Sequence, residues 1–511
     1  MHKSPLLVLC VLVLAAVTLL SLPAGAAQSQ ALPTVDDLAG QRIGIITGTI
    51  HDGLVARRLP TAQRVYYTGA SDLLTAMKTG KIDAFVVPES NAIFMSYEDD
   101  SITWLEEHLL DGDLGFAFPK TDSGRAHNEQ FSAMVRRMKA DGSLQTLVDK
   151  WFSADEGAKT MPDYTALPAD NGTLTMATTA SQIPYDYVRD NKIVGFEVEL
   201  ATLFCRENGY ALKVEDMNFD GILASVQSGK CDFGANCLVS TPERREKVDF
   251  SESYHRESVV FVVPDPAKTG EVSFLESIRT SFEKTFIRED RWKLFLEGVG
   301  TTLLITVSAI LLGTALGFGA YMACRGGNPI ANGVTRFLVW LVHGMPVVVL
   351  LMILYYILFA STPIDGAAVA IIGFTLVFGS AVYAMLQAGV AAVDYGQTEA
   401  AYALGYGSTR AFFRVVLPQA VPHFFPAYKG EITSLIKATA VVGYIAVQDL
   451  TKMGDIIRGR TYEAFFPLIA VAVIYFLLAG GINFLVRRVE LRLDPRRRKP
   501  ETILKGVTIH D

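Results

Sequence analysis

Residues 396–420 read GQTEAAYALGYGSTRAFFRVVLPQA, and this polar segment separates long uncharged runs on both of its sides. Its alanines and glycines would let a short helix pack closely against another protein. Glu399 and Arg410 add charged groups near the ends of such a helix. The pattern indicates a loop helix that lies between membrane helices and fits a groove on a partner.

Half of the residues are hydrophobic, too many for an ordinary soluble enzyme, and four uncharged runs of 27, 28, 28 and 23 residues lie around this segment. Each run can cross a bilayer, which takes about 20 apolar residues in a helix. A fifth apolar stretch contains Lys429, Glu431 and Lys437, so we expect it to face the protein interior. We therefore predict an all-α membrane domain of five helices over residues 298–486. The predicted spans are residues 299–323, 337–360, 367–392, 425–447 and 464–486.

The N-terminus has the features of a secretory signal. Residues 1–27 contain one Lys, an apolar run over 6–22 and small residues before a cleavage point. An uncleaved anchor is the alternative, and both outcomes place the following residues outside the cell. Five spans then place the basic tail, residues 487–511, in the cytoplasm, as the positive-inside rule favours, although Lys452 and Arg458 fall on an outer loop. We predict a multi-pass protein of the cell membrane.

Segment 396–420 resembles the EAA loop of the permease subunits of ABC importers. The resemblance rests on Glu399, Ala400, Ala401, Gly405, Val415, Leu417 and Pro418, at the spacing of that family. In that family the loop binds a groove of a cytoplasmic ATPase and transmits its closure, so an ATPase is the implied partner. Residues 294–498 resemble the polar amino-acid branch of these permeases. A chance amphipathic loop helix is the alternative.

Several positions depart from that branch. His343–Pro346 read HGMP where the family commonly has Arg-Gly-Thr-Pro, and Ala384 and Gln387 replace an acidic residue and an Arg on the third span. Part of a site for a zwitterion in the membrane cavity would then be absent. Lys437 remains at apolar depth, and we expect a substrate or partner carboxylate to face it. Snorkelling to the interface or pairing with Glu431 are equal alternatives.

The outer half alternates strand and helix patterns. Residues 41–119 contain QRIGIIT, RVYYT, DAFVV and LGFAFP with helical segments between them, and residues 173–263 repeat the pattern with TLTMATT, ALKVEDM, DFGANC and SVVFVV. We predict an α/β domain of two lobes. Residues 28–160 hold the second lobe with its C-terminal helices, 161–265 the first lobe, and 266–297 an interfacial linker helix.

Both lobes resemble the amino-acid solute-binding proteins, which are two-lobed, periplasmic-binding-protein-like domains. DDLAGQRIGIITGT and ADGSLQTLVDKWF match the second half of that family, whereas IPYDYVRDNKIVGFEVELA and STPERREKVDFSESY match its first half. The lobe order is therefore permuted, and one circularly permuted clamp is the simplest interpretation. Two truncated tandem domains are the alternative, but each lone lobe would expose an apolar strand edge.

A free amino acid presents a carboxylate, an ammonium and a side chain between the lobes. Arg244, at a helix start, can bind the carboxylate with two parallel hydrogen bonds, and the family has its Arg at this position. Backbone N–H groups of Gly48 and Thr49 suit the same carboxylate. Phe219 stands where the family stacks a ring on the ligand. Each has an alternative interpretation: Arg244 as a surface residue beside Glu243, Gly48 and Thr49 as a plain turn, and Phe219 as a core residue.

Other positions of the predicted site differ from the family and suggest an unusual ligand. Gln182 stands where a second stacking aromatic is common, and Tyr185 follows it. Pro88 replaces the usual Asp for the ammonium, and Glu89 is the substitute we expect if the turn rotates, with a solvated Glu as an equal alternative. The predicted ligand residues are Arg244, Phe219, Gly48, Thr49, Glu89, Gln182 and Tyr185.

The sequence contains no GxxxxGKS or GxxxxGKT loop, so we expect ATP hydrolysis in a separate protein. One EAA loop per chain implies a homodimer, since such importers use two permease halves. The cysteines show no CxxC spacing and the dense basic cluster is confined to the tail, so no metal, cofactor or nucleic acid is expected. The alternative function is a ligand-gated ion channel of the glutamate-receptor type. VVGYIA at 441–446 resembles a potassium filter, but Ile445 replaces its Gly.

Overall fold

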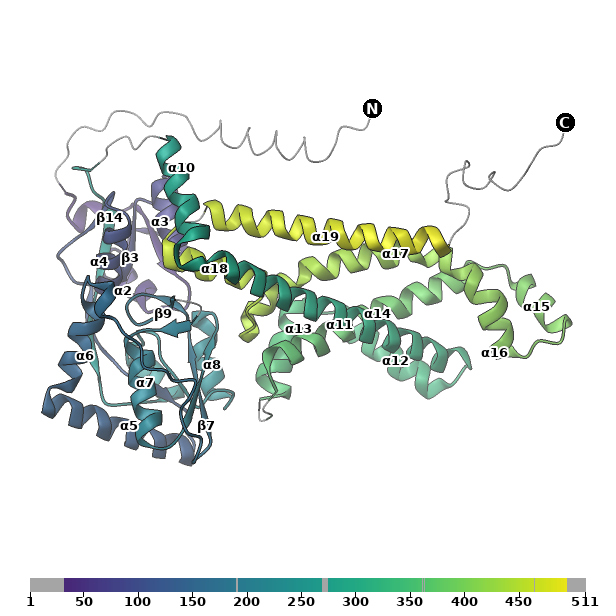
Figure 1. The fold of residues 1–511 in the computed structure, drawn as a ribbon, viewed down its shortest axis with the longest axis horizontal. Helices are drawn as coiled ribbons and strands as arrows, with labels where there is room; N and C mark the ends of the chain where they lie inside the picture. Colours follow the sequence, from purple (N-terminus) through teal and green to yellow (C-terminus); the bar gives the residue numbers. More distant parts are fainter. Residues whose placement is uncertain are drawn as a thin grey trace.

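The computed structural model describes residues 32–189, 192–268, 274–360, 362, 364–463 and 465–493. A domain of strands and helices lies at one end of the molecule, and a bundle of long helices extends away from it (Figure 1). The prediction of an α/β domain followed by a helical domain is thus confirmed. The predicted signal, residues 1–27, and the tail beyond residue 493 lie outside the described residues.

The first sheet is made of β1 (Arg42–Ile46), β2 (Gln63–Tyr67), β3 (Ala84–Pro88), β4 (Ile102–Trp104), β5 (Leu110–Leu114) and β14 (His255–Pro264). Its order is β2-β1-β3-β14-β4, with β5 also paired to β14. The first three strands are parallel and β14 is antiparallel to β3. A strand from the second α/β segment therefore lies inside the sheet of the first segment.

The second sheet is made of β6 (Ala117–Phe118), β7 (Thr173–Thr178), β11 (Ala211–Asp216), β12 (Phe233–Gly234) and β13 (Asp249–Phe250). Its order is β11-β7-β12-β6-β13, so a strand of the first segment lies inside the sheet of the second. A small antiparallel sheet beside it contains β8 (Ser181–Gln182), β9 (Asp186–Arg189) and β10 (Lys192–Val194). Each lobe thus needs strands from both segments.

Helices pack on these sheets and complete the two lobes. The first sheet carries α2 (His51–Arg58), α3 (Ala70–Lys78) and α4 (Glu89–Glu98), and the second carries α7 (Phe196–Glu207) and α8 (Phe219–Gln227). β3, with the sequence AFVVP, is buried at every position, as is typical of a central strand covered on both faces. The helical pair α5 (Asp122–Asp141) and α6 (Ser143–Phe152) turns at Gly142, whose φ of 79° favours glycine.

The helical domain is built on four long helices, α11 (Trp292–Arg325), α14 (Gly366–Ala391), α17 (Leu417–Ala438) and α19 (Phe465–Leu493). α11 and α14 pack most closely where glycines face each other. A Cβ on Gly313 would lie 3.0 Å from the Gly379 nitrogen, and a Cβ on Gly317 would overlap the Gly379 oxygen. Small residues allow two helix backbones to approach in this way.

The predicted second span is broken, and the predicted fourth span ends in a bend. α12 (Pro329–His343) and α13 (Val347–Ile353) meet at an angle of 110°, and Pro346 in the break has no N–H to continue the helix. The fourth span, α17, continues into the 3-10 helix η7 (Thr439–Ile445) and then bends by 54° into α18 (Leu450–Thr461). Three described helices are individually long and apolar enough to cross a membrane, or up to five spans exist if each bent pair counts as one.

The predicted linker helix is also divided. α10 (Phe274–Phe282) is followed by a π-helical turn and a short 3-10 turn before α11 begins. Glu289 and Asp290 have φ values of 54° and 53°, so the backbone leaves the right-handed helical conformation at these two residues, just before α11. Lys284 in the π-helical turn forms an ion pair with Glu98 at 3.0 Å, which attaches the linker to α4.

Candidate functional site

A cavity of about 130 Å³ lies between the two lobes. Its walls come from the turn after β1, the start of α3, the loops that follow β7 and β12, helices α8 and α9 (Pro242–Lys247), and strand β14. A cavity of about 150 Å³ can hold a molecule of the size of benzene, so this one suits a small solute. The polar and aromatic lining includes Thr49, His51, Asp72, Gln182, Phe219, Asn236, Cys237, Arg244 and Glu257.

Arg244 is held in this cavity by the start of α9. Thr241 caps the helix by accepting a hydrogen bond from the Arg244 N–H, and Pro242 occupies the first turn, where its missing N–H costs nothing. Arg244 Nη1 donates to the Val239 oxygen at 3.0 Å, and its guanidinium carbon lies 5.8 Å from the ring centroid of Phe219. Within the described part of the chain, no carboxylate forms an ion pair with Arg244. Burial lowers its pKa, and the guanidinium is available to an anionic group of a ligand.

His51 lies beside Arg244 in the same cavity wall. Its ring is buried, and Nδ1 has no hydrogen-bond partner among the described residues. Burial, together with the nearby positive charge of Arg244, lowers the pKa of His51 to about 4. The imidazole is therefore neutral at pH 7, and Nδ1 can form a hydrogen bond with a ligand.

Glu257 supplies a carboxylate to the cavity from strand β14. It accepts hydrogen bonds from the Ser90 N–H at 3.0 Å and from the Tyr185 hydroxyl. Burial raises its pKa. A buried carboxyl in this position gains most from a cationic ligand group, because the cation restores the charged form. Glu257 is not among the ligand residues predicted from the sequence.

Two further carboxyls lie below the cavity and hold one of its loops. Asp186 and Glu197 are fully buried, and burial raises the pKa of both, Glu197 being raised further by the charge of Asp186. Glu197 accepts from the Cys237 N–H at 2.9 Å and from the Tyr254 hydroxyl. Asn236 and Cys237 have φ values of 154° and 51°, and these hydrogen bonds stabilise that unusual turn in the cavity wall.

Four of the predicted ligand residues, from both lobes, come together. Thr49, Gln182, Phe219 and Arg244 all line the cavity. Gly48 lies behind them, with a φ of 82° that favours glycine, and a Cβ there would lie 3.4 Å from the Asp220 Cβ at the start of α8. The turn after β1 thus faces the first turn of α8 across the cleft.

Glu89 and Tyr185 do not line the cavity. Glu89 begins α4, and its Oε2 lies 3.7 Å from His108 Nε2. Tyr185 is fully buried behind Glu257 and reaches the site through the hydrogen bond to that carboxylate. The residue next to Glu89, Ser90, is the one that contacts Glu257.

One further part of the cavity wall does not belong to the lobes. Four residues of α18, in the helical domain, line it: Lys452, Asp455, Arg458 and Gly459. The sequence placed this segment on an outer loop of the membrane domain without a role in binding.

The segment that resembles the EAA loop forms α15 (Tyr395–Ala403), α16 (Ser408–Ala411) and the π-helical turn before α17. Asp394 caps α15 by accepting from the Gly396 N–H at 2.7 Å. The helix ends where Gly405, with a φ of 82°, donates to the Tyr402 oxygen at 2.9 Å. Glu399 and Ala400 are exposed, Ala401 is buried, and Leu417 and Pro418 begin α17.

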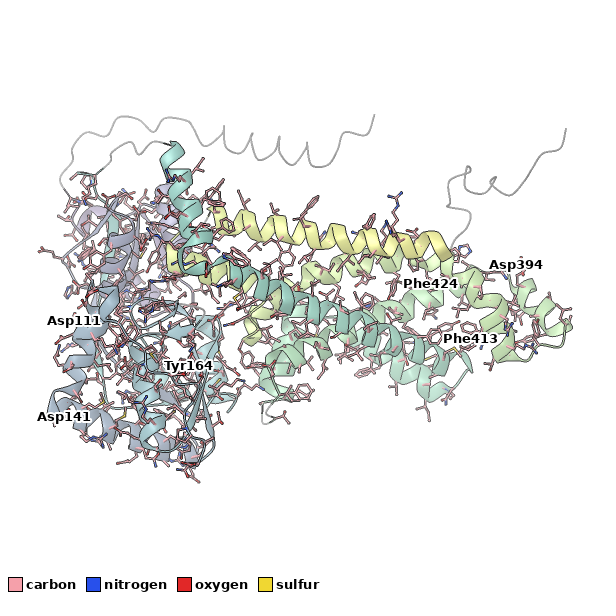
Figure 2. The ribbon with its side chains drawn as sticks, in the orientation of Figure 1. Asp111, Asp141, Tyr164, Asp394, Phe413 and Phe424 are labelled. Atoms are coloured by element: carbon pink, nitrogen blue, oxygen red, sulfur yellow. The ribbon has the colours of Figure 1, made fainter. Side chains whose placement is uncertain are left out.

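α15 presents an apolar surface at the end of the molecule opposite the lobes. Tyr395 and Leu404 are 71% and 78% exposed. Asp394 and Phe413 lie at that end, whereas Asp111 and Asp141 lie at the other (Figure 2). Large exposed apolar side chains in a polar loop region indicate a docking surface.

The side of the helical bundle is also apolar. α12 and α19 expose large side chains, among them Phe337, Trp340 and Phe476. Lys437, in the last turn of α17, is exposed as well.

Among the described residues no group of three His, Cys, Asp or Glu side chains could hold a metal ion.

Comparison with known proteins gives two similarities. The model of the bacterial extracellular solute-binding proteins, family 3, matches residues 174–433. This match starts at β7 and extends through the first long helices into α17.

The helical domain is similar to transport permeases. The L-cystine transport system permease protein TcyL of Bacillus subtilis is 30% identical over 219 residues, which cover 41% of this chain and 90% of TcyL. The glutamine transport system permease protein GlnP of Escherichia coli is 30% identical over 203 residues, which cover 39% of this chain and 93% of GlnP. A solved amino acid ABC transporter "with histidines" is 28% identical with a TM-score of 0.38, and the match covers 44% of this chain and 100% of that one.

Proposed function

Because the chain belongs to the bacterial extracellular solute-binding proteins, family 3, and its helical domain to the amino-acid transport permeases, we propose that residues 32–264 form one complete, circularly permuted solute-binding domain. The exchange of β6 and β14 between the two sheets supports this proposal, because neither lobe has a full sheet without the other segment. In two truncated tandem domains, each sheet would contain strands of one segment alone, and β3 would have an unpaired edge.

The protein is the membrane permease of an ABC importer for amino acids, fused to its own solute-binding domain. The observation that carries this conclusion is the presence, in one chain, of a cavity between two lobes and a helical domain that matches transport permeases. ATP hydrolysis takes place in a separate partner subunit.

The cavity is proposed to hold the amino acid as a zwitterion. Arg244, which has no carboxylate partner in the described structure, binds the ligand carboxylate with help from the Thr49 backbone. Glu257 takes the ammonium in place of Glu89. Asp72 and Asp455 also line the cavity, but both pair with Arg458, whereas no cationic side chain of the described residues forms an ion pair with Glu257. The ring of Phe219 covers the ligand beside the guanidinium, where it gains a cation–π contact with Arg244.

α15 is proposed to be the contact with the ATPase. Its exposed Tyr395 and Leu404 would fit a groove of that partner, with Glu399 and Ala400 on the same short helix. One such helix per chain requires two chains for two ATPases, so the working unit is a homodimer. This orientation places α15 and the C-terminal tail in the cytoplasm and the lobes outside. Lys437 then faces the interior between the two copies, where it meets the carboxylate of the passing solute.

Binding by the purified full-length chain in lipid nanodiscs tests the proposed site. Calorimetric titration with the common L-amino acids and L-cystine should find saturable binding of at least one of them, with one molecule per chain. Arg244→Ala should weaken that binding by about 30-fold or more, because removing one partner of a buried charge pair costs roughly 2–5 kcal/mol. Arg245→Ala, on the exposed side of the same helix, should bind like the wild type. Equal binding by Arg244→Ala and the wild type would contradict the site.

A further inference from the structure

We infer that α18 of the membrane domain is part of the solute-binding site: it closes the cavity against both lobes at once, so that solute affinity depends on the position of the membrane helices. This inference rests on the proposed function and adds to it a binding element from the helical domain. Three sets of contacts carry it.

The first contact joins α18 to the first lobe. Lys452 Nζ lies 3.1 Å from Asp216 Oδ1, and their side chains are 8% and 0% exposed. The same Asp216 oxygen accepts from the Ala180 N–H at 2.9 Å. Asp216 therefore connects Lys452 to the loop whose residues Ser181 and Gln182 line the cavity. A buried ion pair of this kind depends strongly on both partners staying in place.

The second contact joins α18 to the other lobe. Arg458 forms an ion pair with Asp72 in the first turn of α3, and its Nη1 also lies 2.8 Å from Asp455 Oδ1. Asp72 lines the cavity and accepts from the Thr68 hydroxyl at 2.9 Å. Because Lys452 pairs with one lobe and Arg458 with the other, the lobes cannot separate at this edge without breaking one of the two ion pairs.

The third contact is a close approach that needs a glycine. A Cβ on Gly459 would lie 2.5 Å from the Ser181 Cβ, closer than real side chains come. The backbone of α18 thus rests directly on the cavity loop, and a larger residue at 459 must push the helix away. This close packing indicates a specific interface between α18 and the first lobe.

The start of α18 is fixed to the membrane helices. Asp449, its N-cap, accepts from the Tyr475 hydroxyl of α19 at 2.9 Å, and the Leu450 N–H donates to Thr302 Oγ1 of α11 at 3.2 Å. A shift of α11 against α19 therefore moves Lys452 and Arg458 relative to the lobes. This gives a direct mechanical route by which rearrangement of the spans weakens the hold on the solute.

Binding by the full-length chain in nanodiscs tests the inference, with L-glutamine and L-cystine as probes. Gly459→Leu and Lys452→Gln should each lower the affinity tenfold or more. Gly480→Leu is the matched control, because nothing lies within 4 Å of a Cβ at that position of α19, and it should bind like the wild type. If Arg244→Ala abolishes binding while Gly459→Leu and Lys452→Gln bind like the wild type, the inference is overturned and the proposed function stands.

A disulfide test needs no ligand and covers the case in which a variant fails to fold or neither probe binds. The pair Ser181→Cys and Gly459→Cys should cross-link on mild oxidation, whereas each single variant should not. Absence of the cross-link in a protein that elutes as the wild type does would overturn the inference. If neither probe nor any other amino acid binds the wild type, the proposed function fails, and the cross-link alone decides whether α18 lies on the cavity.

Discussion

The backbone N–H of Ser90 donates a hydrogen bond to the Glu257 carboxylate at 3.0 Å, although the two residues are 167 positions apart in the chain. Ser90 belongs to the first α/β segment and Glu257 to the second. This carboxylate of the cavity lining is thus fixed by a helix start from the other half of the domain. A binding site assembled in this way forms only when both segments fold together.

The fragment of residues 28–264 is therefore expected to unfold in a single cooperative transition. Each sheet contains a strand of the other segment, so neither lobe retains a complete core alone. Differential scanning calorimetry checks this expectation by comparing the calorimetric and van't Hoff enthalpies. Two separate transitions would indicate two tandem domains and contradict the permuted clamp.

Glu197→Gln is expected to stabilise that fragment increasingly as the pH rises from 5 to 8. The folded-state pKa of Glu197 is raised, so the folded state binds a proton that the unfolded state has released above its ordinary pKa of about 4.3. The unfolding free energy of the wild type then falls by up to about 1.4 kcal/mol for each unit of rising pH. Glutamine does not titrate, so the variant lacks this loss.

Urea unfolding at three pH values measures this difference. Glu207→Gln, a partly exposed residue at the end of the same helix α7, is the control and should show no such trend. A stability difference for Glu197→Gln that stays constant with pH would contradict the raised pKa.

Gly317→Leu is expected to lower the melting temperature of the full-length chain in detergent. A side chain at 317 would overlap the Gly379 backbone and separate α11 from α14, a form of overpacking that costs about 1–3 kcal/mol or more. Gly319→Leu is matched to it, since a Cβ there meets nothing within 4 Å. Equal melting temperatures for the two variants would mean that α11 and α14 do not pack at this point.

Leu404→Asp is expected to abolish amino-acid uptake by cells while leaving amino-acid binding by the purified chain unchanged. Leu404 is 78% exposed at the end of α15, so the change removes apolar docking surface without a cost to the fold. Leu404→Met should retain uptake because it remains apolar. If Leu404→Asp lost both binding and uptake, a role of α15 confined to contact with the ATPase would be contradicted.

The sequence predicted the domain order because charge-free runs and strand periodicity are local signals. It also selected four residues that line the cavity, Thr49, Gln182, Phe219 and Arg244. The break in the second predicted span lies at Gly344–Pro346, and Pro346 was visible in the sequence as a residue that cannot continue a helix. Apolar composition alone does not reveal the 110° bend at that point.

The remaining site residues depend on contacts between distant segments. Glu257 lines the cavity because β14 crosses into the first sheet, and the only local signal of this placement is its position before the apolar run SVVFVV. Lys452 and Arg458 went against the charge pattern expected of an outer loop, and the structure pairs them with Asp216 and Asp72. Their partners lie more than two hundred residues away, where no local pattern connects them.

The most direct test of the account is amino-acid uptake by spheroplasts that are washed free of soluble binding proteins and express this chain with its ATPase. Because the chain carries its own solute-binding domain, we predict ATP-dependent accumulation of the bound amino acid without any added protein, and its loss in Arg244→Ala. Uptake that appears only when a soluble binding protein is added, or an ionic current that needs no ATP, would contradict the account.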